Sequence, residues 1–195
     1  DLFAEYATYY PMLINTIKTH NWISGIDLDI EETVSIDDIK MLIRDINTEF
    51  GNDFVITMAP LAGSLMNDSS GMGGFIYKDL YSSTEGKFIT RFNVQAYGSY
   101  TLKTFETIVN NGYPAKQIVL GMVTGQFNKD NFKNALDEIK DIVEIYPDIG
   151  GVFSWEYCNS PPDPDDPSDW ARLMASSLKN TFMSKFYKYI KQYFY

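Results

Sequence analysis

The sequence predicts an α/β fold that forms part of a (β/α)8 (TIM) barrel. Short apolar segments, of the kind found in buried strands, alternate with longer segments in which apolar residues recur every three or four positions. Five strand–helix units follow one leading helix, whereas a complete barrel has eight strands and about 250 residues. The 195 residues therefore match the last five-eighths of a barrel, roughly strands four to eight. We interpret residues 1–195 as one partial domain.

The first elements have recognisable ends. A helix is expected over residues 2–20, and a strand over residues 25–31. Ser35 begins the next helix because its hydroxyl can accept a backbone N–H of the first turn, and Asp38 stands three residues further on, as in a capping box. Gly51 ends this helix, since glycine readily adopts the left-handed conformation that follows many helices.

The remaining elements keep the same alternation. Four more strands are expected, at Phe54–Ala59, Phe92–Tyr97, Ile118–Thr124 and Gly151–Trp155. Further helices are expected at Leu102–Asn111 and Asn131–Tyr146, and the last helix begins near Ser168 and runs toward the C-terminus. The serine- and glycine-rich segment 63–86 is predicted to be a long irregular loop, and a loop of that length usually carries function or mobility.

Composition excludes some classes of partner. The net charge is −10 and the basic residues are dispersed, so a nucleic acid would be repelled, whereas a neutral oligosaccharide is compatible with this charge. No segment approaches the roughly 20 apolar residues of a membrane span. The single cysteine, Cys158, excludes an internal disulfide framework. Aromatic residues make up 15% of the chain, and they fit either sugar-stacking platforms or an ordinary core.

Three acidic residues share one face of the strand 25–31. Side chains alternate along a strand, so Asp27, Asp29 and Glu31 point to the same side, about 7 Å apart. At an effective dielectric constant near 20, each like-charge pair costs roughly 2 kcal/mol, so at least one acid should keep its proton near neutral pH, as a general acid must. An edge strand with its acidic face in water is the alternative. The strand ends at Glu31, however, and that end is the rim where barrels hold their active sites.

The same strand resembles a known signature. Residues 25–31 are similar to the Asp-x-Asp-x-Glu motif on the fourth strand of family 18 glycoside hydrolases, the chitinases and endo-β-N-acetylglucosaminidases. Four later segments resemble the family's fifth to eighth strands in order: Thr57–Pro60, Asn93–Tyr97, Val119–Gly121 and Gly150–Tyr157. The run Trp155–Ser160 is closest to fungal-type chitinase-like members. The resemblance implies a partial catalytic domain that acts on chitin or the chitobiose core of N-glycans.

The resemblance also implies roles for the acidic residues. Glu31 would protonate the glycosidic oxygen and later act as base. In this family the substrate's N-acetyl carbonyl is the nucleophile. Asp29 would orient that acetamido group, and Asp27 would hold Asp29. Tyr97 would donate a hydrogen bond to the same group. The mechanism implies no cofactor and no metal.

Other residues are expected to bind the sugar. Trp155 would form the floor of the −1 subsite, and Gln95 and Met58 would line the pocket. Tyr157 is a further candidate platform, and a plain packing role fits it equally. Trp22 is expected to pack under the first helix, and Phe127 is a weaker candidate for a sugar platform.

One position departs from the family pattern. The first Asp of the signature is Ser24 here, which can form hydrogen bonds but carries no charge, so we expect a tuned or slower enzyme. The competing hypothesis is a non-hydrolytic, chitinase-like carbohydrate-binding protein, a lectin or an inhibitor. Such relatives usually lose the Glu that this chain keeps as Glu31.

Two other features are given structural interpretations. His20, the only histidine, is expected to cap a helix or face solvent. The segment 163–167 lacks the ligand spacing of a calcium loop and is predicted to be a solvated, proline-rich loop.

The start of the chain leaves localisation open. Residues 1–5 look like the interior of a helix, so we expect further sequence upstream, and the absence of a targeting segment says nothing about secretion. An extracellular protein is compatible with the family resemblance. Without strands one to three the first strand has an unpaired edge, so the 195 residues alone are expected to be unstable and inactive. The oligomeric state is not predicted.

Overall fold

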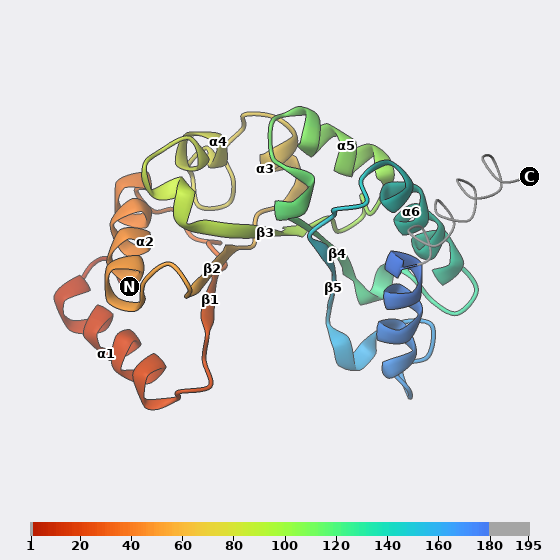
Figure 1. Cartoon of the computed structure of the whole chain (residues 1–195), viewed down its shortest axis with the longest axis horizontal. Coiled ribbons are helices and arrows are strands. Elements are labelled where there is room, and N and C mark those ends of the chain that lie inside the picture. The colour runs from red at the N-terminus through yellow and green to blue at the C-terminus, as the bar shows by residue number, and fades with distance from the viewer. Residues whose placement is uncertain (1, 180–195) are drawn as a thin grey trace, which may run out of the picture.

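A computed structural model describes residues 2–179. Within this range the sheet has five strands, all parallel and adjacent in chain order. The strands are β1 (Gly25–Leu28), β2 (Val55–Met58), β3 (Ile89–Gln95), β4 (Ile118–Val123) and β5 (Gly151–Trp155). The helices form an arc outside the strands, as in one side of a barrel (Figure 1). The predicted α/β fold with a partial barrel is confirmed.

The helices occupy the connections between the strands. They are α1 (Tyr6–Thr19), α2 (Ile36–Phe50), α3 (Ala62–Met66), α4 (Tyr77–Tyr81), α5 (Leu102–Asn110) and α6 (Phe132–Ile145). Residues 168–179 are also helical, as expected, and the rest of the predicted last helix lies outside the described residues. None of the helices within residues 2–179 is long and apolar enough to cross a membrane.

Most predicted ends are close to the observed ones. The hydroxyl of Ser35 caps α2, but it accepts the N–H of Asp37 at 3.1 Å, so the expected capping box with Asp38 is wrong. Gly51 ends the same helix with a φ of 81° and donates its N–H to the carbonyl of Asn47. Helix α1 begins at Tyr6 rather than at residue 2, since residues 2–5 form turns.

Two predictions about the loops are wrong. Strand β1 ends at Leu28 rather than Glu31, because its neighbour β2 ends at Met58, which pairs with Leu28, and no described strand continues beyond it. The segment 63–86 is not an irregular loop: it contains most of α3, all of α4 and the start of a 3-10 helix, Glu85–Phe88. Four of its apolar side chains are buried and belong to the core: Leu65, Phe75, Tyr77 and Leu80.

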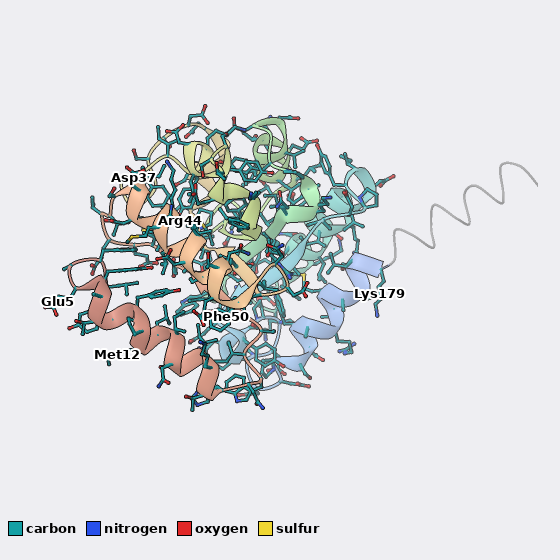
Figure 2. The ribbon with its side chains drawn as sticks, turned by 60° about the vertical axis from the view of Figure 1, so that its left-hand side comes forward. Glu5, Met12, Asp37, Arg44, Phe50 and Lys179 are labelled. Carbon is teal, nitrogen blue, oxygen red and sulfur yellow. The ribbon has the colours of Figure 1, made fainter. Side chains whose placement is uncertain are left out.

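The core lies between the strands and the helices. Side chains that point toward the helices are almost completely buried, such as Met58, Phe92 and Leu120 at 0% exposure. The helices also contact each other: α1 lies beside α2 (Figure 2), joined by a hydrogen bond from Tyr6 to Asp45 at 3.0 Å. This packing fixes the strands, and so it fixes the side chains on their other face.

Trp22 does not pack under the first helix. Its side chain is 76% exposed and meets the His20 ring edge-on, with ring centroids 5.7 Å apart. The loop that follows α1 is short and solvent-exposed, so it offers no apolar surface for the indole. His20 is exposed and its Nδ1 lies 2.9 Å from the carbonyl oxygen of Thr16, which agrees with the expected capping role.

Candidate active site

One cavity of about 630 Å³ lies at the carboxyl ends of the strands. Strand alternation brings its lining together, because residues two positions apart on one strand point to the same face. The lining residues come from or follow β1, β2, β3 and β5: Asp27, Asp29, Glu31, Ala59, Asn93, Gln95, Tyr97, Phe153 and Trp155. Six of the eight residues predicted for the site therefore meet in one place.

The side chain of Asp27 is held by the two neighbouring strands. Thr57 lies opposite Asp27 in the sheet, and its hydroxyl donates to Asp27 Oδ1 at 2.5 Å. The amide of Asn93, on β3, donates to the same oxygen at 3.1 Å. The sequence suggested that Asp27 holds Asp29. Within the described chain no hydrogen bond joins these two residues, and the partners of Asp27 are Thr57 and Asn93 instead.

Asp29 has a different environment. Gln95 donates to its Oδ1 at 3.2 Å, and the same amide nitrogen also donates to the carbonyl of Ala59 at 2.8 Å. Burial, followed by the charges of Glu31 and Asp27, raises the pKa of Asp29 above its ordinary value. The direction agrees with the expectation that one member of the acidic face holds its proton more tightly than a free carboxyl group.

Glu31 lies three residues beyond β1, on backbone that another loop supports. The N–H of Val34 donates to the carbonyl of Gly73 at 3.0 Å. A side chain at Gly73 would come within 2.8 Å of Ile30, so glycine allows the loop to approach this closely. The segment between α3 and α4 therefore packs against the turn that carries Glu31.

Tyr97 closes the cavity near the acids. It lies two residues beyond β3 and is half-buried. Burial and the charges of Asp29 and Glu31 raise the pKa of its hydroxyl, so the group keeps its proton and can serve as a hydrogen-bond donor.

Aromatic rings form the other wall. Trp155 ends β5, is 63% exposed and lines the cavity, so one face of the indole is available to a ligand. The peptide bond between Trp155 and Glu156 is cis. Phe153 lies on the same face of β5 and packs directly over Gly121 of β4, where any side chain would collide with its ring.

Two predicted binding residues lie elsewhere. Met58 does not line the cavity: it is 0% exposed and belongs to the core, because alternation turns it toward the helices while Thr57 faces the cavity. Tyr157 is 49% exposed on the 3-10 helix Tyr157–Asn159 and is also outside the cavity lining. Phe127 contacts Tyr100 edge-on at 6.0 Å and is half-buried.

Three residues of this site were not predicted from the sequence: Thr57, Asn93 and Phe153. The signal was present, because Asn93 precedes Gln95 by two positions and Phe153 precedes Trp155 by two. Residues 163–166 are exposed, as predicted for the proline-rich loop. Within residues 2–179 no group of three or more His, Cys, Asp and Glu side chains is arranged to hold a metal ion.

The solved structures similar to this chain include an endo-β-N-acetylglucosaminidase and chitinases. A fungal endo-β-N-acetylglucosaminidase from glycosyl hydrolase family 18 has 33% sequence identity and a TM-score of 0.82 over 91% of this chain. ChiC, a chitinase from Aspergillus fumigatus, has 30% identity and a TM-score of 0.72 over 90% of this chain. Chitinase A from Streptomyces coelicolor, at 18% identity and a TM-score of 0.61, shares the fold.

These matches cover most of this chain but a smaller share of each solved structure. This chain spans 64% of the length of the endoglycosidase and 65% of that of ChiC. No family model matches the chain, and no curated protein matches its sequence. The order of parallel strands and the two structures of 30% identity or more confirm the resemblance seen in the sequence: the chain has the chitinase-like fold of glycoside hydrolase family 18, as a partial TIM barrel.

Proposed function

We propose that the protein is a retaining glycoside hydrolase that cleaves β-1,4-linked N-acetylglucosamine, in chitin or in the chitobiose core of N-glycans. The observation that carries the proposal is the convergence of Asp27, Asp29 and Glu31 with Tyr97 and Trp155 in one cavity. Acidic groups beside an exposed indole suit a neutral sugar, because the ring stacks on the indole while the acids transfer protons.

The first step breaks the glycosidic bond. Glu31 gives its proton to the glycosidic oxygen, and the carbonyl oxygen of the substrate's own acetamido group attacks the anomeric carbon as the leaving sugar departs. Asp29 accepts the acetamido N–H and stabilises the positive charge of the oxazolinium ion that forms. Tyr97 donates a hydrogen bond to the acetamido oxygen, and Trp155 lies under the sugar ring.

The second step restores the enzyme. Glu31, now ionised, takes a proton from a water molecule, and the oxygen of that water attacks the anomeric carbon. The oxazolinium ring opens, the acetamido group is regenerated, and the product keeps the original configuration. Glu31 regains its proton, so the two steps together consume one water molecule.

Replacing the acid tests this assignment. In the full-length protein, Glu31→Gln should lower kcat by about 100- to 10,000-fold, the range expected for loss of a general acid. The substrates are a fluorogenic chito-oligosaccharide and a high-mannose glycopeptide, whose relative rates separate a chitinase from an endoglycosidase. Glu32→Gln is the matched control, because Glu32 is exposed and does not line the catalytic cavity.

The same experiment tests the alternative function, carbohydrate binding without hydrolysis. A non-hydrolytic carbohydrate-binding protein would bind chito-oligosaccharides with equal affinity in the wild type and in Glu31→Gln, and neither would release product. Hydrolysis at the same rate in both proteins would refute Glu31 as the acid.

A further inference from the structure

We propose that Thr57 and Asn93 are positioning residues of the catalytic site, which hold the Asp27 carboxylate as a fixed negative charge beside Asp29. The inference rests on the proposed function and adds two residues for which the family resemblance gave no role. It concerns the way in which the neighbouring strands fix the acid that lies beside Asp29.

The side chains of Asp27, Thr57 and Asn93 form a triangle in which each lies within hydrogen-bond distance of the other two. Thr57 and Asn93 both donate to Asp27 Oδ1, at 2.5 and 3.1 Å, and the Asn93 amide also lies 3.3 Å from the Thr57 hydroxyl oxygen. Thr57 is 7% exposed, so water cannot easily replace this hydroxyl. Two donors directed at one carboxylate oxygen fix its orientation.

Asp29 has less support from donors. Its only described partner is the Gln95 amide at 3.2 Å, which is shared with the Ala59 carbonyl. Asp27, with two donors on one oxygen, is therefore the more firmly held of the two acids. Its charge is one of the causes that raise the pKa of Asp29, after burial and the charge of Glu31.

The support comes from neighbouring strands rather than from the strand itself. At the position three residues before Asp27, Ser24 uses its carbonyl to accept the N–H of Val55 at 2.9 Å, and its side chain forms no hydrogen bond within the described chain. The side-chain hydrogen bonds of Asp27 therefore come from Thr57 on β2 and Asn93 on β3.

Other charged or titratable groups lie on the same side of the described sheet. They are Asp29, Glu31 and Tyr97 of the cavity lining, Arg91 two residues before Asn93 on β3, and Tyr77 of α4. Burial, followed by the charges of Asp29 and Asp27, raises the pKa of Tyr77, so its phenol stays neutral. The cavity residues of β5 are Phe153 and Trp155, which carry no charge.

A set of three variants tests the positioning role in the full-length protein. Thr57→Val keeps the shape and removes the hydroxyl, Thr57→Ser keeps the hydroxyl, and Asn93→Leu removes the amide. Thr57→Val and Asn93→Leu should lower kcat by about 10- to 100-fold with little change in KM, as misplacement of a supporting group does. Thr57→Ser should restore most of the loss. Equal melting temperatures of the Val and Ser variants separate the effect from unfolding.

The pH dependence gives a readout that packing alone would not change. Without its donors the Asp27 carboxylate is no longer fixed beside Asp29, so its charge contributes less to the raised pKa of Asp29. In Thr57→Val, the Asp29 titration followed by carboxyl ¹³C NMR should therefore move to lower pH.

The NMR titration decides the inference even if the proposed function fails. A wild type that hydrolyses neither substrate would refute the proposed function, while a shift of the Asp29 titration in Thr57→Val but not in Thr57→Ser would still support the positioning role. Identical Asp29 titrations in wild type and Thr57→Val would overturn it.

Discussion

The two faces of one sheet differ in almost every property. On the helix-facing side, Leu28 and Val94 are 6% and 0% exposed and have apolar neighbours. On the other side, Asp27 and Gln95 form hydrogen bonds with side chains from other strands and line a cavity. Core residues and cavity residues alternate along the same strands, as Val94 and Gln95 do on β3. A step of one residue along a strand therefore separates the residues that stabilise the fold from those proposed to act on a substrate.

This comparison explains why the site is built from several strands. The cavity residues come from or follow β1, β2, β3 and β5, and the parallel register brings the carboxyl ends of these strands to the same rim. The packed outer face keeps the strands from shifting, because core residues in close contact resist displacement. Substitutions on the two faces should therefore have separable effects, on stability for one and on activity for the other.

The largest expected effect is on the helix-facing side. Met58→Ala should lower the free energy of unfolding by about 2–5 kcal/mol, because it leaves a cavity in a fully buried site. The midpoint of urea denaturation measures this change. KM for a chito-oligosaccharide should stay unchanged at a temperature where the variant is folded, since Met58 does not line the cavity.

Leu65→Ala is a suitable control, because Leu65 is equally buried in α3 and has no predicted site role. If Met58→Ala raised KM while Leu65→Ala did not, Met58 would belong to the site as the sequence first suggested.

Met58 also shows what the sequence could and could not predict. Alternation on strand 25–31 placed Asp27, Asp29 and Glu31 on one face, and the structure agrees. The same rule applied to β2 puts Thr57 opposite Asp27 and turns Met58 away, but the resemblance alone had assigned Met58 to the pocket. Here the period of the strand was the better guide.

Other features depend on contacts that a single sequence does not reveal. The serine- and glycine-rich segment 63–86 suggested an irregular loop, yet Tyr77 and Leu80 are buried, and the Tyr77 ring meets that of Phe92 on β3 with centroids 6.4 Å apart. Trp22 was expected to be covered, yet no described element lies over it. Local composition cannot show which distant surface will meet a segment, whereas the ends of regular elements depend on local signals such as Ser35 and Gly51.

A smaller effect on stability is expected at Gly121, where the inner face of the sheet is closely packed against Phe153. Gly121→Ala should lower the free energy of unfolding by about 1–3 kcal/mol, because the added methyl group meets the Phe153 ring and must displace it. Since Phe153 lines the cavity, KM should also rise. Gly121 is therefore an exception to the separation of the two faces, because a substitution at this inner-face position should affect both stability and binding.

Gly125→Ala is the control, because a side chain there meets nothing within 4 Å. Equal stability and KM in the two variants would mean that the ring moves without cost and that Phe153 has no part in shaping the wall.

The smallest expected effect concerns the charge of the inner face. Because burial and neighbouring charges raise the pKa of Asp29 in the folded protein, its ionised form opposes folding. Below the ordinary pKa of an Asp near 3.9, both states hold the proton and Asp29 contributes nothing. As pH rises through the folded pKa, the folded state loses its proton and the cost becomes complete. Asp29→Asn removes this cost, so at pH 7 it should be more stable than the wild type, by less than about 1 kcal/mol because the group is solvent-exposed.

Thermal melts at pH 3 and pH 7 measure the difference between Asp29→Asn and the wild type. The gain should be present at pH 7 and shrink toward pH 3, where the wild-type carboxyl group is protonated as well. Glu32→Gln, at an exposed carboxylate outside the catalytic cavity, should show no comparable change. If Asp29→Asn were more stable than the wild type by the same amount at both pH values, the effect would come from packing and not from charge. Packing would then determine stability on the inner face, as it does on the helix-facing side.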